Sequence, residues 1–309
     1  MNEKIQLLAD NIEKVIIGKR EVILKLAAAL LSGGHVLIED VPGVGKTRLV
    51  TALSESVNGE CRRIQFTPDL MPSDITGFSM INPKTGESEY RSGAAMCNFL
   101  LADEINRASP KAQSALLEIM EELQVSVDGV THRLPQPFMT LATQNPVETY
   151  GTYHLPEAQM DRFLMKLSIG YPDPSVEMHI LEKNSGEKGR LPAVITLDDI
   201  IELKKQAENV RVHESVKKYI IDIVNATRNS EFTVLGASPR GSIALYIASK
   251  SLALINGRNY VVPDDVKYLA VEVLAHRLML SPKGKSVHGS SEAVMHAILD
   301  SVAIPQAQV

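Results

Sequence analysis

The sequence is poor in cysteine, in long apolar runs and in clustered basic residues, and each shortage argues against a class of protein. Its two cysteines, Cys61 and Cys97, lie far apart in 309 residues and show no CxxC spacing. They are typical of core thiols in a reducing compartment, which makes a disulfide or a cysteine metal site unexpected. No uninterrupted apolar run reaches membrane-spanning length, and residues 1–6 lack an apolar signal core. We therefore expect a cytoplasmic protein with no membrane segment.

The charge balance argues against a nucleic-acid partner. The formal net charge is -5 and no long basic run is present, so the chain lacks the electrostatic footprint that polyanion binding needs. With 44% hydrophobic and 22% charged residues, the composition is that of an ordinary globular protein. The length is ample for a sizeable core and suggests about two domains.

A glycine-rich stretch is the strongest local signal. It reads Val41-Pro42-Gly43-Val44-Gly45-Lys46-Thr47, after the apolar run 36–38 and before an amphipathic segment that starts at Arg48. This strand, turn and helix predict a phosphate-binding loop, in which backbone N–H groups and a helix N-terminus surround phosphate oxygens. Lys46 would reach the β- and γ-phosphates, and the Thr47 hydroxyl would bind Mg²⁺. The alternative is a glycine turn that caps an ordinary helix.

Two neighbouring features bear on this nucleotide site. Asp40 stands where the general phosphate-loop consensus has its first glycine. Ile17 and Gly18 form an apolar turn between two predicted N-terminal helices, just ahead of the nucleotide strand. This turn could wall an adenine ring, or it could be a plain helix–helix joint.

Two carboxylates follow a second apolar run. Residues 98–102 precede Asp103 and Glu104, which predicts a buried parallel strand that delivers acids at its C-terminal edge. There Asp103 would hold the Mg²⁺ shell, and Glu104 would polarise the attacking water as general base. The alternative for Asp103 is a cap on the following helix.

Three more polar residues have candidate roles at a γ-phosphate. Asn145 follows the apolar strand 138–143, where its amide could orient water; the alternative is an Asn-Pro turn with Pro146. Arg162 stands just before the last core strand, where an oligomeric ATPase would present an arginine to its neighbour, unless it forms a surface ion pair. Arg240 lies in a first helical turn, a place that favours a bound phosphate or an inter-helix salt bridge.

The chain divides into two predicted parts. Residues 1–173 form an α/β nucleotide-binding core with a parallel sheet, and residues 174–309 form a helical lid after the Pro-rich stretch near 172. Turn residues between β-prone runs predict two hairpin inserts, at about 78–90 and 124–134. The first hairpin has few apolar residues and is expected to protrude from the core.

Five blocks of the sequence occur in an informative order: Gly43–Thr47, Leu101–Ala108, Ala142–Pro146, Ala158–Phe163 and Gly236–Arg240. Together they resemble a MoxR-type AAA+ ATPase, over a match from about residue 5 to residue 279. The resemblance implies Walker A in the first block, Walker B at Asp103 and Glu104, and sensor 1 at Asn145. It also implies an arginine finger at Arg162 and sensor 2 at Arg240. Asp40 resembles what this family often carries.

The resemblance implies more about function. Family members bind ATP and Mg²⁺ and work as ring homo-oligomers, usually hexamers, that mature or remodel other proteins. Their partners often bear a von Willebrand factor A domain, and the hairpins look like the helix-2 insert and pre-sensor-1 hairpin of that clade. The expected mechanism uses Arg162 from the next subunit and Arg240 from the lid at one γ-phosphate, whose loss would change the angle between lid and core. Alternatives are a magnesium-chelatase-like metal-insertion subunit, a nucleotide switch with little turnover, and a nucleic-acid motor.

Overall fold

The computed structural model describes residues 1–145, 153, 155–183 and 190–305. Its centre is a parallel sheet with the strand order β2-β5-β8-β1-β9. The strands are β1 (Val36–Glu39), β2 (Cys61–Gln65), β5 (Phe99–Asp103), β8 (Met139–Gln144) and β9 (Met165–Leu167). Strand β8 thus separates β1, which leads into the glycine-rich loop, from β5, which ends in the first of the two acids. The predicted α/β class with a parallel core is confirmed.

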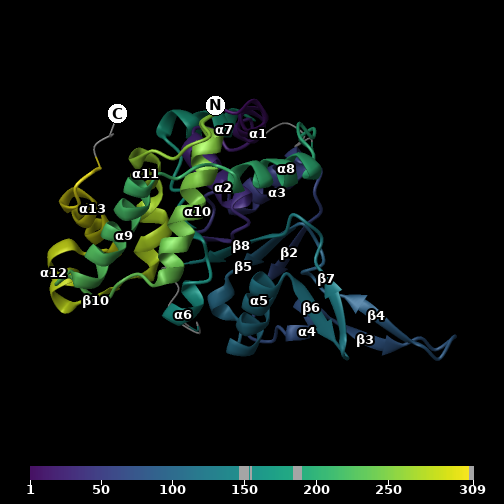
Figure 1. Cartoon of the computed structure of the whole chain (residues 1–309). Coiled ribbons are helices and arrows are strands. Elements are labelled where there is room, and N and C mark those ends of the chain that lie inside the picture. The colour runs from purple at the N-terminus through teal and green to yellow at the C-terminus, as the bar shows by residue number, and fades with distance from the viewer. Residues whose placement is uncertain (146–152, 154, 184–189, 306–309) are drawn as a thin grey trace.

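Alternating side chains bury both faces of this sheet, as the pleat of a strand requires. Val36 and Ile38 belong to one apolar cluster, whereas Leu37 belongs to a second cluster on the other face. Figure 1 shows the resulting layers, with α3 on one side of the sheet and α5 on the other. The helices that surround the sheet are α1 (Glu3–Glu13), α2 (Arg20–Leu31), α3 (Lys46–Ser56), α4 (Pro72–Thr76), η1 (Ile105–Arg107), α5 (Pro110–Glu122) and α6 (Glu157–Met160).

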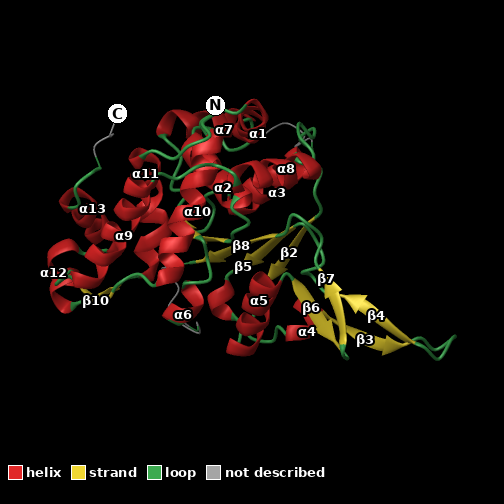
Figure 2. Ribbon diagram, in the orientation of Figure 1, coloured by secondary structure: helices red, strands yellow, loops and turns green. Residues whose placement is uncertain are grey.

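Two β-hairpins extend from the α5 side of the sheet. They pair β3 (Gly77–Ile81) with β4 (Ser88–Ser92), and β6 (Gln124–Val127) with β7 (Val130–Arg133). The β3–β4 hairpin projects away from the body of the molecule (Figure 2). Its Tyr90 ring stacks on His132 of the other hairpin, with ring centroids 3.9 Å apart. The two inserts therefore contact each other.

The C-terminal part is mainly helical and contains one short β-ribbon. Strands β10 (Thr233–Leu235) and β11 (Met279–Leu280) pair antiparallel. The prediction of an entirely helical lid is wrong in this detail. Its helices are α7 (Pro174–Lys183), α8 (Leu197–Glu208), α9 (Glu214–Asn229), α10 (Pro239–Ile255), α11 (Pro263–Leu274), η2 (Ala275–Arg277), α12 (Pro282–His288) and α13 (Ser291–Ser301).

One apolar cluster joins these helices to the sheet. It runs from Val36 in β1, through Leu26 in α2, to Leu245 in α10 and Val273 in α11. The lid and one face of the nucleotide core therefore share buried surface, which favours a firm connection between them. Within the described residues, no helix is long and apolar enough to cross a membrane.

Candidate nucleotide site

The glycine-rich loop joins β1 to α3 as the sequence predicts. Gly43 and Gly45 have φ angles of 89° and 98°, in the left-handed region where a side chain is strained. Gly45 is the N-cap of α3, so Lys46 and Thr47 occupy the first helical turn. Pro42, Gly43, Thr47 and Arg48 are exposed. The free N–H groups of that turn and the exposed loop form a suitable cradle for phosphate oxygens.

Asp40, which stands where the consensus has glycine, makes structural contacts that account for an aspartate at this position. Its buried carboxylate accepts hydrogen bonds from the backbone N–H groups of Ile169, at 2.5 Å, and Gly170, and from the Ser168 hydroxyl at 3.0 Å. These residues follow β9, the neighbour of β1. The carboxylate therefore ties the base of the phosphate loop to the exit of the edge strand.

The Lys46 ammonium lies between the ends of β1 and β8. It donates to the carbonyl oxygens of Asp40, at 2.5 Å, and Gln144, at 3.3 Å. Burial lowers the pKa of Lys46, and the nearby carboxylates of Asp40, Asp103 and Glu104 oppose that shift. Lys46 and both predicted acids thus share one electrostatic environment at the carboxyl edge of the sheet.

Asp103 is the buried last residue of β5, and its carboxylate is held from two sides. Oδ1 accepts from the Thr143 hydroxyl at 3.0 Å, and Oδ2 accepts from Arg63 Nε at 2.6 Å. Thr143 Oγ1 also accepts from the Glu104 backbone N–H at 2.9 Å. Thr143 comes from β8, so it fixes both acids relative to the strand that carries Asn145. An oriented carboxylate at this edge fits the hard, oxygen-liganded chemistry of Mg²⁺.

Glu104 has an unusual backbone conformation. Its φ of 56° and ψ of 51° lie in the left-handed region, which a residue other than glycine adopts at a cost of roughly 1–3 kcal/mol. The side chain accepts from Gln65 Nε2 at 2.8 Å and pairs with Arg107 at 3.0 Å. Such strain persists where the surroundings hold it in place, and it clusters at functional sites.

The remaining core candidates lie around the same edge. Asn145 is buried directly after β8; its predicted turn partner Pro146 lies outside the described residues. Gly18, with a φ of 72°, comes close to Val176 of α7, and Ile16 approaches Gly45 of the phosphate loop. The half-buried Ile17 lies in the same turn. The N-terminal turn therefore borders the phosphate loop, where an adenine ring could lie.

Comparison with known proteins decides the family. A profile described as "ATPase family associated with various cellular activities (AAA)" matches residues 35–165, and an AAA lid profile matches residues 225–298. The chain is 42% identical over 304 residues to Chaperone MoxR1 of Mycobacterium tuberculosis, across 96% of this chain and 81% of that protein. The chain belongs to the MoxR family of AAA+ ATPases.

Two further similarities agree with this membership. The chain is 52% identical to the uncharacterized protein YeaC of Bacillus subtilis, across 96% of this chain and 93% of that protein. It also resembles a crystal structure from Cytophaga hutchinsonii assigned as an ATPase, with a TM-score of 0.91 and 39% identity, covering 98% of this chain and 95% of that one. The predicted family and the fold of a nucleotide-binding core with a helical lid are confirmed.

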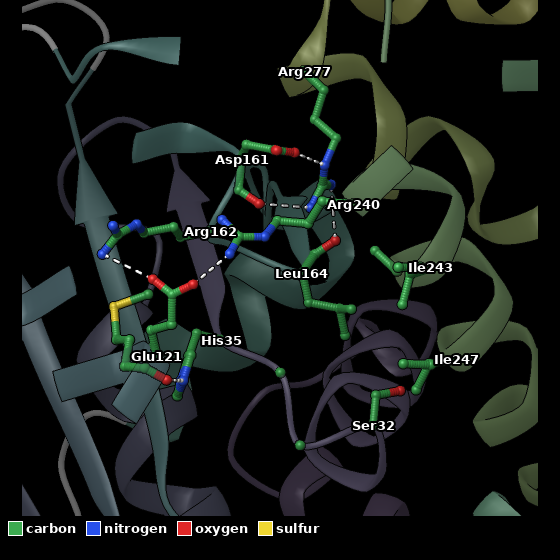
Figure 3. A pocket seen from close by; sticks show the side chains of 14 residues that line it. Ser32, His35, Glu121, Asp161, Arg162, Leu164, Arg240, Ile243, Ile247 and Arg277 are labelled. Atoms are coloured by element: carbon green, nitrogen blue, oxygen red, sulfur yellow. Dashed lines mark hydrogen bonds and ion pairs between the residues drawn. The ribbon is translucent and has the colours of Figure 1, made fainter. Parts of the chain in front are cut away.

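The two predicted arginines of this MoxR-family ATPase meet in a separate pocket of about 230 Å³ (Figure 3). The Glu121 carboxylate contacts both side chains, with Arg162 Nη1 at 3.3 Å from Oε2 and Arg240 Nη2 on Oε1. The same pocket is lined by Gly33, Gly34 and other residues around the start of β1. It therefore lies at the amino edge of the sheet.

This placement bears on the role at a γ-phosphate that the sequence predicts for Arg240, which stays a prediction. The phosphate loop leaves the carboxyl end of β1, whereas Arg240 lies beside residues that precede its amino end. Four strand residues span roughly 13 Å, so the length of β1 lies between the phosphate loop and the residues beside Arg240. The alternative of an inter-helix salt bridge, here with Glu121 of α5, is what the structure contains. Arg162 lies at the same edge, just before β9.

Several residues of these sites had no distinctive signal in the sequence. Glu121 is one of three glutamates in α5, with Glu118 and Glu122, and nothing in the local sequence distinguishes it from them. Arg277 is buried in η2 and pairs with Asp161 at 2.7 Å. Its guanidinium also donates to the carbonyl oxygens of Asp161, Phe163 and Leu164, which flank Arg162. Only long-range folding brings these partners together, so no local spacing could have revealed them.

A buried histidine makes stability depend on pH. His35 Nδ1 accepts from the Thr140 N–H at 3.0 Å, and Nε2 donates to the Met120 carbonyl at 2.8 Å. Burial lowers the pKa of His35 from 6.5 to about 4. Between these values the unfolded chain binds a proton that the folded chain does not, so acid lowers the free energy of unfolding. The contribution of neutral, buried His35 to the free energy of unfolding is therefore fully present above pH 6.5 and is lost as the pH falls towards 4.

We expect this effect to appear as a difference between wild type and a His35→Gln variant in urea unfolding. Lowering the pH from 7 to 4.5 should cost the wild type about 2–3 kcal/mol more than the variant, because the variant lacks this titrating group. Equal losses in the two proteins would show that His35 is not the group responsible.

Proposed function

We propose that the chain hydrolyses MgATP to drive chaperone-like remodelling or maturation of partner proteins. One observation carries the proposal: Lys46, Asp103, Glu104 and Asn145 lie at the same carboxyl edge of the sheet. In this scheme Lys46 binds the β- and γ-phosphates, while Thr47 and Asp103 hold Mg²⁺. Glu104 accepts a proton from the attacking water, which Asn145 orients. The Ile17–Gly18 turn borders the adenine.

The position of the arginines supports hydrolysis shared between copies of the chain. Arg162 and Arg240 lie at the opposite edge of the sheet from their own phosphate loop, so they would act on the nucleotide of an adjoining copy. Ile243 and Ile247, 58% and 37% exposed, follow Arg240 on α10 at helical spacing and line the same pocket. An apolar border around cationic side chains suits a face that another copy covers.

This arrangement requires a homo-oligomer in which each copy completes the nucleotide site of the next. Copies that contact each other head to tail can close into a ring, and we propose a ring of six. A protein partner with a von Willebrand factor A domain and a cytoplasmic location complete the proposal. They rest on the family alone.

A nucleotide switch with little turnover would use the same phosphate loop. The strained backbone of Glu104 favours hydrolysis over such a switch, because simple binding gives no reason to hold that carboxylate in the left-handed conformation. The site therefore fits an enzyme better than a passive binder.

Replacement of Lys46 by alanine tests the nucleotide site itself. We expect the affinity for MgATP to fall about 10- to 100-fold, because at least one charge-assisted hydrogen bond to phosphate is lost. Isothermal titration calorimetry on the full chain measures the affinity, and circular dichroism checks that the variant is folded. An unchanged dissociation constant would refute this assignment of the phosphate loop.

A further inference from the structure

We propose that Glu121 is a positioning residue that holds Arg162 and Arg240 together as one phosphate-binding unit for the adjoining copy. The inference rests on the proposed function and assigns a role to a carboxylate that the nucleotide chemistry does not otherwise require. Glu121 lies at the end of α5, far from its own chain's phosphate loop.

The contacts of Glu121 show a shared counter-ion. Each carboxylate oxygen faces a different guanidinium, one from the core and one from the lid (Figure 3). Two guanidinium cations placed near each other repel. A carboxylate that contacts both attracts each of them and makes the electrostatic energy of the group favourable. The side chains of Glu121, Arg162 and Arg240 are 40%, 33% and 46% exposed. Since exposed pairs add little to stability, the geometry is the more important consequence.

The charge of the pocket leaves room for an anion. Three arginines, Arg162, Arg240 and Arg277, face two carboxylates, Glu121 and Asp161, and His35 beside them is held neutral by the low pKa that burial gives it. Among the residues that line this pocket, the arginines therefore outnumber the carboxylates by one. A guanidinium has five N–H donors, so Arg162 and Arg240 can each bind Glu121 and still donate to a phosphate oxygen.

Buried contacts fix the backbones that carry this unit. His35 binds the carbonyl oxygen of Met120, the residue before Glu121. On the arginine side, the Asp161 carboxylate accepts from Arg277 Nε at 2.7 Å and from the Ser238 hydroxyl at 2.9 Å. Ser238 is the N-cap of α10, two residues before Arg240. Asp161 therefore joins the start of the lid helix to the segment of Arg162, and Glu121 joins their side chains.

The experiment compares Glu121→Gln with Glu122→Gln in the full-length protein. Glu122 is the next residue of α5, it is exposed, and the described part of the chain gives it no ion pair, so it controls for the lost charge. Steady-state ATP hydrolysis is measured at several protein concentrations, and MgATP affinity is measured by calorimetry. We expect Glu121→Gln to lower kcat on the order of 10- to 100-fold, the scale of a misplaced catalytic group. KM and MgATP affinity should change less than about threefold, since the variant's own site stays intact.

Two further proteins separate positioning from damage to the fold. Glu121→Asp keeps the charge on a shorter side chain and should recover part of kcat. Mixing Glu121→Gln with Lys46→Ala protein should also recover turnover, because the Lys46→Ala copies supply an intact arginine pair to nucleotide sites of the other copies. Loss of MgATP affinity in Glu121→Gln, or no recovery in the mixture, would overturn the role in trans.

The outcomes also distinguish this inference from the proposed function. If Arg162→Ala lowers turnover but Glu121→Gln does not, the positioning role is wrong and shared hydrolysis stands. If the turnover of Arg162→Ala and that of Lys46→Ala both equal the turnover of the wild type, shared hydrolysis is wrong, and the role of Glu121 is refuted with it.

Discussion

Replacement of Arg162 by alanine is expected to lower the ATP turnover number by about three to five orders of magnitude, the contribution of an arginine supplied in trans. The side chain is one-third exposed and lies at the amino edge of the sheet, away from its own phosphate loop. MgATP affinity of the isolated chain should therefore stay the same. A coupled phosphate-release assay measures turnover, and calorimetry measures the affinity.

Arg190→Ala is the matched control for that variant. Its side chain is 69% exposed and its ion pair with Glu55 is long, at 3.8 Å, so removing it should leave turnover within about twofold of the wild type. Arg162→Ala and Lys46→Ala proteins, each inactive alone, should regain activity when mixed, because each supplies what the other lacks. A mixture as inactive as its components would exclude the arginine finger.

Replacement of Glu104 by glutamine is expected to lower turnover by about two to four orders of magnitude, the usual contribution of a general base. The amide is nearly isosteric and can still interact with Gln65 and Arg107, so the MgATP site should remain formed. The variant should bind MgATP as tightly as the wild type and retain it without hydrolysis. Single-turnover hydrolysis and calorimetry, performed on the same sample, test both parts.

Glu118→Gln serves as the control for charge, since Glu118 is an exposed residue of α5 away from the carboxyl edge. Turnover of Glu104→Gln within tenfold of the wild type would contradict its role as base. Retained MgATP would make the variant a tool for capturing the partner protein, because the ATP-bound state would persist.

The nucleotide core could be predicted from local patterns because its chemistry follows the ends of strands. An apolar run that ends in Asp103 and Glu104 is both a buried strand and a pair of acids at its edge. Gly43 and Gly45 occupy positions whose positive φ only glycine adopts at little cost, so the residue types alone predict the loop. The starts of α5 at Pro110 and of α10 at Pro239 also have a local signal, because each proline follows a serine N-cap.

The fold alone decided which residues from distant parts of the chain become partners. Strand β8 lies between β1 and β5, and this order lets Thr143 contact Asp103 and the Glu104 backbone. No periodicity distinguishes Glu121 from Glu118 or Glu122, although Glu121 is the one placed between the two arginines.

Local sequence was enough to predict the phosphate loop, the paired acids and the family, because each depends on neighbours in the chain. Long-range packing, by contrast, places Arg240 beside Arg162 at the far edge of the sheet and brings Asp40 to the backbone after β9. A local motif encodes conformation within a few residues only. The edge to which a side chain belongs depends instead on how helices from the two ends of the chain pack into one apolar core.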